Sequence, residues 1–113
     1  MDANTVLLFT RAGLGHADAA LQGRLATTFL SLANEHGLLP AKILFYTEGV
    51  QLVCEGSPVL DQLRALETRG IELIICRTCL DYFGLLEKVR VGVVGGMADI
   101  IAAMQQAGKV ISL

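Results

Sequence analysis

Two cysteines separated by two residues are the part of this sequence best suited to chemistry. Cys76 and Cys79 enclose Arg77 and Thr78, and the segment follows an apolar run from Ile71 to Ile75. An apolar run of this length before a helical turn predicts that the pair lies where a strand meets a helix. Backbone N–H groups at a helix start, together with a neighbouring guanidinium, favour the thiolate and lower the pKa of a cysteine. We therefore predict a nucleophilic thiol at this junction.

Such a pair supports several kinds of chemistry. Two thiols this close can exchange a disulfide, or one can resolve a sulfenate or a persulfide that forms on the other. They can also simply pack as structural thiols. A tetrahedral zinc site needs four ligands, and the remaining Cys54, His16 and His36 are isolated in the sequence. We therefore expect no metal and no cofactor, and we interpret Cys54 as a small core residue.

Two other segments could contribute to a site around the thiols. Gly13 and Gly15 form a turn that lacks the third glycine of a dinucleotide fingerprint, because Asp18 stands there. We interpret this loop as a structural turn that could form a wall of the pocket, and His16 within it as a solvated or capping residue. Glu48 follows an apolar run and could orient a thiol, although helix capping is its more typical role. The candidate residues around the two thiols are Arg77, Thr78, Glu48 and Gly13.

Apolar runs that alternate with helical patterns predict the architecture that positions these residues. We expect an α/β fold, a three-layer α/β/α sandwich with a mainly parallel sheet of about five strands. The predicted strands are Thr5 to Thr10, Ala41 to Thr47, Ile71 to Cys76, Val89 to Val94 and Lys109 to Leu113. Because the carboxyl ends of parallel strands meet at one edge, the loops that carry the candidate residues should converge there.

Apolar spacing and capping residues predict three helices between these strands. Gly37 and Gly70 are expected to end the first two, Ser57 and Pro58 to begin the second, and Gly108 to end the third. We also expect a short helical turn within residues 49–56. The stripes expected to face the core are Leu21, Leu25, Phe29 and Leu32, then Val59, Leu63 and Leu66, then Met97, Ile100, Ile101 and Met104.

Composition limits the classes of partner. The 113 residues suit one domain over residues 1–113, and a net charge of −2 without a basic run argues against nucleic acid. A hydrophobic fraction of 53% suits a buried sheet with apolar surface left for other subunits, so we expect a homo-oligomer. No apolar run approaches the roughly 20 residues of a membrane helix. Without a basic start typical of a secretory signal, and with an odd number of cysteines, we expect a cytoplasmic protein.

Four segments of the sequence resemble a known family. They are ILFYTEGV at 43–50, CEGS at 54–57, CRTCLDYFGL at 76–85 and GKVI at 108–111. With them the chain is similar to the DsrE/DsrF-like sulfur-relay family, and most similar to the DsrE-like domain of YedF-type selenium-metabolism proteins. The resemblance implies a DsrEFH-like fold and a trimer or hexamer.

The same resemblance implies a role for each thiol. Cys76 would accept sulfane sulfur as a persulfide and pass it to a partner protein, and Cys79 would be an additional, resolving thiol. Because this chain has no segment like the TusA-like domain of YedF-type proteins, a TusA-like donor or acceptor would act in trans.

Three other functions compete with sulfur relay. A thioredoxin-like oxidoreductase also joins strand, Cys-x-x-Cys and helix, but it requires a later proline beside the site, and no proline follows Pro58. A rhodanese would expect a single cysteine in a longer cradle of backbone amides. The third is a non-catalytic oligomeric binding module whose cysteines only pack. The alkylation rate at neutral pH separates this last reading from the others, because buried structural thiols react slowly.

Overall fold

Five short apolar runs pair side by side to form one sheet. The computed structural model describes residues 1–113, and the strand order is β4-β3-β2-β1-β5 with every neighbouring pair parallel. The strands are β1 (Thr5–Phe9), β2 (Lys42–Phe45), β3 (Glu72–Cys76), β4 (Val93–Gly95) and β5 (Lys109–Ser112). The predicted α/β fold with a parallel sheet of about five strands is confirmed.

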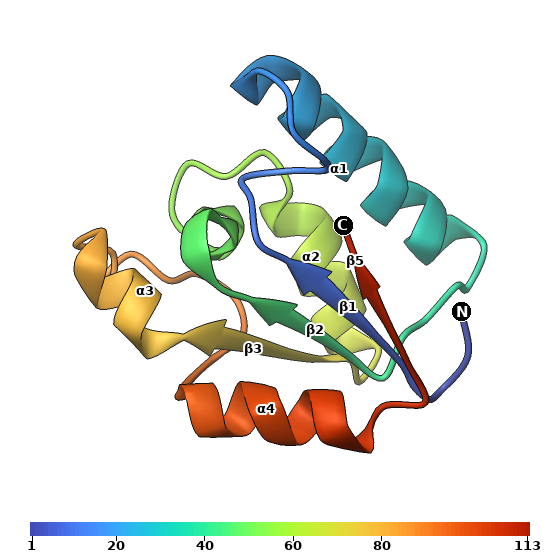
Figure 1. Ribbon diagram of the computed structural model, residues 1–113. Coiled ribbons are helices and arrows are strands. Elements are labelled where there is room, and N and C mark those ends of the chain that lie inside the picture. Colours follow the sequence, from blue (N-terminus) through green and yellow to red (C-terminus); the bar gives the residue numbers. More distant parts are fainter.

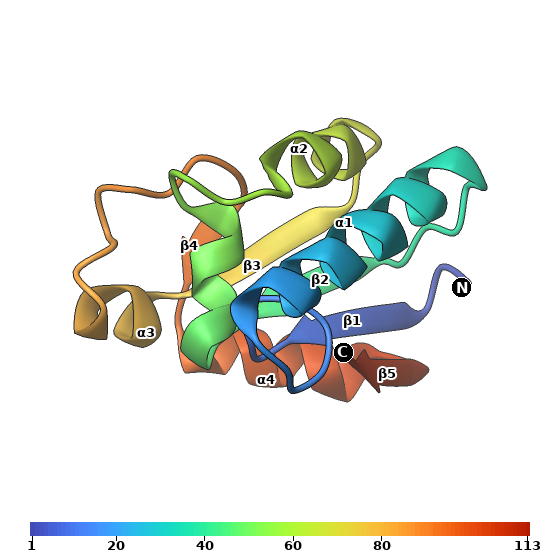
Figure 2. The same cartoon turned by 90° about the horizontal axis from the view of Figure 1, so that it is seen from above.

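Helices cover both faces of this sheet. Four α-helices and a 3₁₀ helix connect the strands, namely α1 (Ala19–Glu35), η1 (Thr47–Val53), α2 (Leu60–Thr68), α3 (Arg77–Tyr82) and α4 (Met97–Gln106). Helices α1 and α2 lie on one face and α4 on the other, while α3 extends from the end of β3 (Figure 1 and Figure 2). The result is the expected three-layer sandwich. None of these helices combines the length and the apolar character that crossing a bilayer requires.

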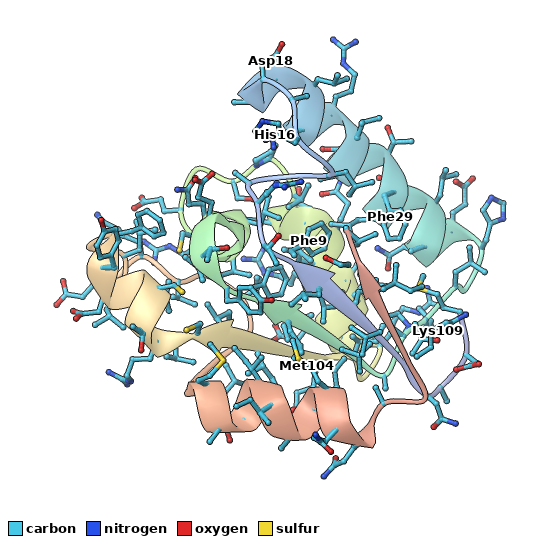
Figure 3. The ribbon with its side chains drawn as sticks, viewed as in Figure 1. Phe9, His16, Asp18, Phe29, Met104 and Lys109 are labelled. Carbon is cyan, nitrogen blue, oxygen red and sulfur yellow. The ribbon has the colours of Figure 1, made fainter.

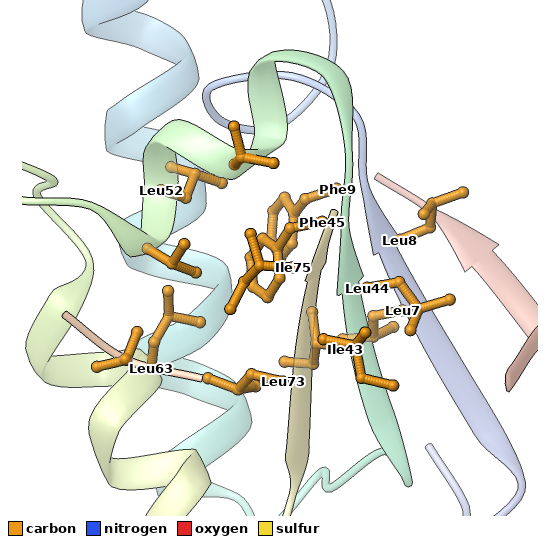
Figure 4. Close-up of a cluster of buried hydrophobic side chains, with 14 of the residues drawn as sticks. Leu7, Leu8, Phe9, Ile43, Leu44, Phe45, Leu52, Leu63, Leu73 and Ile75 are labelled. Atoms are coloured by element: carbon orange, nitrogen blue, oxygen red, sulfur yellow. The ribbon is translucent and has the colours of Figure 1, made fainter. Parts of the chain in front are cut away.

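The core between the sheet and α2 contains a stacked aromatic pair. The rings of Phe9 and Phe45 lie 5.6 Å apart with an interplanar angle of 8°. Ile75 and the fully buried Leu63 belong to the same cluster (Figure 4). Burial of each such side chain stabilises the fold by about 1.5–3 kcal/mol, so this cluster anchors the strand ends next to which the thiols lie.

The face of α1 that packs on the core differs from the predicted one. Its buried residues are Gln22, Ala26, Leu30 and Ala33. The predicted stripe is wrong, because Leu21, Leu25 and Leu32 are 44%, 43% and 42% exposed and Phe29 is only partly buried. The small side chains of the two alanines let the helix lie close to the layer beneath it, and the leucines are left on its flank.

The stripe predicted for α4 is also only partly correct. Ile100 is buried as expected, and the other buried residue of the helix is Ala103. Met97 and Ile101 are exposed, and Met104 is partly buried. The stripe predicted for α2 is confirmed, since Val59, Leu63 and Leu66 are all buried.

Helix ends agree with the expectation in part. Gly37 and Gly70 follow α1 and α2 in the left-handed region, with φ of 64° and 91°. Helix α2 begins two residues after the predicted start, because Val59 occupies the N-cap and its N–H donates to the Ser57 hydroxyl at 3.2 Å. The helical turn expected within residues 49–56 is η1, which begins earlier, at Thr47.

The fourth strand is shorter than expected and lies later in the chain. The sequence predicts a strand from Val89 to Val94, whereas β4 is Val93–Gly95. Val89 instead forms an isolated antiparallel bridge with Cys54. Gly92, with a φ of 83°, separates the two segments, and its N–H donates to the Glu67 carboxylate at 2.9 Å. This turn explains why the apolar run does not form one continuous strand.

Candidate functional site

The two thiols lie where β3 passes directly into α3. Cys76 is the last residue of β3 and the N-cap of α3, and Cys79 lies in the first turn of that helix. The predicted strand-to-helix junction is therefore confirmed. The side chain of Cys76 is buried, with 1% of the residue exposed, whereas Cys79 is half-buried. Solvent therefore reaches the pair through Cys79.

Cys79 has contacts that act on its pKa in opposite directions. Burial raises the pKa of the Cys79 thiol, and a hydrogen bond with the Cys76 thiol raises it further. The backbone N–H of Thr47 donates to the Sγ atom of Cys79 at 3.1 Å and lowers the pKa. Because the raising effects dominate, the expected lowering of the pKa is wrong for Cys79. Desolvation is the largest of these effects, and it outweighs the hydrogen bond from the Thr47 N–H.

The register of the sheet explains why Thr47 reaches Cys79. Phe45 pairs with Ile75, so β2 and β3 end side by side and the residues that follow them are neighbours. The chain then turns at Thr47, whose φ is 47°, and enters η1. The Thr47 hydroxyl donates to the carbonyl oxygen of Thr10 just beyond the end of β1. Thr47 thus contacts segments that follow β1 and β3.

A polar cavity of about 510 Å³ lies beyond the carboxyl ends of β1 and β2. Its lining residues are Thr10, Arg11, His16, Ala17, Gln22, Tyr46, Thr47 and Glu48. His16 lies on the loop between β1 and α1 (Figure 3). Two segments with candidate residues, the loop with His16 and the strand end with Glu48, therefore meet at this edge. Open parallel sheets bind their ligands beyond the carboxyl ends of the strands, which is where this cavity lies.

The other candidate residues lie elsewhere. Arg77 and Thr78 are exposed, and their side chains form no hydrogen bond or ion pair within the protein. Gly13 is buried against α1, where an added Cβ would lie 2.2 Å from the carbonyl oxygen of Gln22. Gly13 therefore serves the packing of the loop. Thr47 is the contact that sequence reasoning missed, because nothing in the sequence indicates a left-handed conformation for a β-branched residue.

Cys54 lies apart from the Cys76 and Cys79 thiols. It is buried in the core, as predicted, and its thiol donates to the carbonyl oxygen of Val50 at 3.2 Å. Burial raises the pKa of the Cys54 thiol, and the charge of Arg90 opposes this rise. Cys54 also lines a second cavity of about 410 Å³, together with Phe83 and Leu85. No group of three or more His, Cys, Asp or Glu side chains is placed to hold a metal ion.

Comparisons with known proteins place this geometry among related folds. In a scan of protein families, residues 7–113 match the DsrE/DsrF-like family. The YchN protein from E. coli has a similar structure, with a TM-score of 0.72, 18% identity and coverage of 99% of this chain and 100% of that chain. A search of curated proteins gave no match.

Two further solved structures are similar, and both are described as proteins of unknown function. MTH1491 from Methanobacterium thermoautotrophicum has a TM-score of 0.68 at 16% identity and covers 99% of this chain and 100% of its own. BT1422 from Bacteroides thetaiotaomicron has a TM-score of 0.68 at 14% identity, with 97% and 95% covered. At these identities the structural likeness shows the fold alone.

Proposed function

This chain belongs to the DsrE/DsrF-like family, which is associated with sulfur relay, and on that premise we propose that it accepts sulfane sulfur as a persulfide on Cys79 and passes it to a partner protein. The observation that carries the proposal is the exposure of the pair, since Cys79 is half-buried and Cys76 is 1% exposed. The resemblance implied Cys76 as the acceptor. The exposures favour Cys79 for first contact with a donor, with Cys76 as its buried neighbour.

The transfer needs no oxidant or reductant. Because the pKa of Cys79 is raised, its thiol is protonated at neutral pH, and the anionic donor persulfide is the base that takes this proton. The Cys79 thiolate then attacks the outer sulfur of the neutral donor persulfide. A new S–S bond forms on Cys79, the S–S bond of the donor breaks, and the donor departs as a thiolate.

Delivery to a partner reverses these roles. A thiolate of the partner attacks the outer sulfur of the Cys79 persulfide, and Cys79 is the leaving group. A leaving thiol departs faster when its pKa is lower, so the N–H of Thr47 assists this step. The resemblance of residues 76–85 to YedF-type proteins supports a TusA-like protein with its own thiol as the partner.

Persulfide uptake by single-cysteine variants tests the proposal. Reduced protein is incubated with glutathione persulfide, and the mass of the intact protein is measured without reductant. The wild type, Cys76→Ser and the matched control Cys54→Ser should each gain one sulfur atom, and Cys79→Ser should gain none. Loss of uptake in Cys76→Ser alone would return the acceptor role to Cys76. No uptake by any form would refute sulfur relay.

Thiol–disulfide exchange is the second candidate, because the Cys76 and Cys79 thiols are in hydrogen-bonding contact. In that case the same incubation should leave a disulfide between Cys76 and Cys79 and release hydrogen sulfide, with no sulfur retained on the wild type. Peptide mapping of the product separates the two functions. Retained sulfur on Cys79 supports relay, and a stable intramolecular disulfide supports exchange.

A further inference from the structure

We propose that Thr47 is a positioning residue of the thiol site, which holds its backbone N–H on Sγ of Cys79 by anchoring its own side chain to the end of β1. The inference rests on the proposed function, because it identifies what orients the sulfur that would carry the persulfide. It extends that function to a residue outside the Cys-x-x-Cys segment, 32 positions away from Cys79 in the chain.

The backbone of Thr47 adopts a conformation that its residue type disfavours. Its φ is 47°, and it is the only residue other than glycine with a positive φ in the protein. A β-branched side chain at such a φ is strained, and strain of this kind persists only where surrounding contacts impose it. Glycine would adopt the same conformation without strain. The threonine side chain must therefore contribute something that glycine could not.

The hydroxyl of Thr47 supplies that contribution. It donates to the carbonyl oxygen of Thr10, and it also lies 2.7 Å from the carbonyl oxygen of Tyr46. The bond to Thr10 joins the turn to the end of β1. On the other side of the peptide, the N–H of Tyr46 donates to the carbonyl oxygen of Phe9 at 3.1 Å. The Thr47 N–H belongs to the peptide between Tyr46 and Thr47, and both of these residues are thus hydrogen-bonded to the end of β1.

The residues that follow Thr47 add a steric clamp. Gly49 lies so close to β1 that a Cβ at this position would be 2.1 Å from the carbonyl oxygen of Phe9. The N–H of Gly49 donates to the carbonyl oxygen of Tyr46 at 3.0 Å. With little freedom for the turn to move, the N–H of Thr47 remains directed at Sγ of Cys79, 3.1 Å away.

A fixed N–H donor has a chemical consequence for the thiol. A hydrogen bond to the charged form of a group favours that form, so this N–H stabilises negative charge on Sγ as Cys79 ionises or leaves. It is the only backbone N–H in the protein that donates to a sulfur atom. Thr47 also lines the polar cavity with Arg11 and Glu48, so the thiol site and the cavity share this residue.

Alkylation of Cys79 across a range of pH tests the positioning role. The rate with iodoacetamide is followed by peptide mapping in the wild type, Thr47→Gly, Thr47→Ser and the control Thr68→Ala. The control removes a threonine hydroxyl that donates to a carbonyl oxygen on α2. Thr68 ends α2 just before β3 begins, whereas the thiols lie at the other end of β3. Circular dichroism checks that each variant is folded.

We expect Thr47→Gly to relieve the strain but to lose the anchor. Its Cys79 should ionise at higher pH than in the wild type and react about 3- to 10-fold more slowly at pH 8. Thr47→Ser, which keeps the hydroxyl, and Thr68→Ala should match the wild type. A folded Thr47→Gly with the wild-type pH profile would overturn the proposal, and so would a Thr47→Ser variant that behaves like Thr47→Gly.

Amide hydrogen exchange tests the contact between the Thr47 N–H and Cys79 without a substitution at Thr47. The Thr47 N–H should exchange faster in Cys79→Ala than in the wild type, and Cys54→Ala should leave its rate unchanged. Equal rates in Cys79→Ala and the wild type would refute the contact. Neither measurement uses a sulfur donor, so failure of persulfide uptake and failure of the Thr47 role are distinguishable.

Discussion

Partial burial shields the Cys79 thiol from water and also makes it less acidic. Burial and the Cys76 thiol raise its pKa, and the N–H of Thr47 opposes them. A thiol with these contacts reacts slowly with a general electrophile at neutral pH, because the thiolate is the reactive form. If Cys79 accepts a persulfide as proposed, the anionic donor supplies the base that ionises this thiol. Local desolvation is therefore the main factor that sets how readily the Cys79 thiol ionises.

The buried Cys54 thiol makes the free energy of unfolding depend on pH. Burial raises its pKa in the folded state, so above the ordinary cysteine pKa of about 8.5 the unfolded state binds fewer protons than the folded state. The free energy of unfolding should consequently fall as pH rises through this window, and the contribution is fully present below it. Cys79 adds an effect of the same sign.

Urea unfolding between pH 7 and pH 10 measures this dependence. Cys54→Ala should be less stable than the wild type at pH 7, because a buried side chain is truncated, but the difference should shrink as pH rises. Thr68→Ala, which removes no titratable group, should keep the wild-type slope. A difference between Cys54→Ala and the wild type that is constant over the whole range would contradict the assignment.

The 3₁₀ helix η1 is the element that brings Thr47 to the thiols, and its position depends on one close approach. The backbone of Gly49 packs directly on the carbonyl group of Phe9, where no side chain fits. Four buried residues of η1, Gly49, Val50, Leu52 and Val53, attach it to the core. A larger residue at position 49 must therefore displace either η1 or the end of β1.

We predict that Gly49→Ala lowers the free energy of unfolding by about 2–4 kcal/mol, because the added methyl group meets backbone atoms that cannot yield. Chemical denaturation monitored by circular dichroism measures the change. Gly23→Ala is the matched control, since its Cβ would have only Pro58 nearby, at 3.6 Å, and it lies within α1. This control should be neutral or stabilising by up to about 1 kcal/mol. Equal stabilities for the two variants would rule out the close approach.

At the level of the molecule, the flank of α1 bears an apolar surface without a partner. Leu21, Leu25 and Leu32 are each more than 40% exposed. Asn34 and Ser31 face α2, where both form hydrogen bonds with Gln62. With 3.6 residues per turn, the leucines lie roughly a third of a turn away from that contact. They project from the side of α1 that α2 does not cover.

We propose that this flank contacts a second copy of the chain, as the hydrophobic composition led us to expect. Light scattering after gel filtration should give a mass that is a multiple of the protomer mass. Leu25→Glu should weaken the association by about tenfold or more, since a charge would be buried without a partner. Ala20→Glu, on the α2 side of the same helix, should leave the mass unchanged. A monomeric wild type would refute this proposal.

Much of the fold was predictable because its signals are local. Alternating apolar runs and helical spacing identified all five strands and the order of the elements, and the run before Cys76 placed the thiols at a strand-to-helix junction. Hydrophobicity of a segment depends on its own residues, so the sequence reports it directly. The fourth strand begins later than predicted because the turn at Gly92, whose N–H donates to the distant Glu67 carboxylate, decides where pairing with β3 begins.

The properties of the site depend on contacts between segments that are far apart in the sequence. Which face of α1 is buried, which of the two thiols meets solvent, and the sign of the pKa shift at Cys79 all follow from how the layers pack. The N–H of Thr47 reaches Sγ because β2 and β3 end side by side. Local residue type decided that a pair of thiols would stand at the end of β3, whereas packing and desolvation decided how exposed each thiol is and in which direction the pKa of Cys79 shifts.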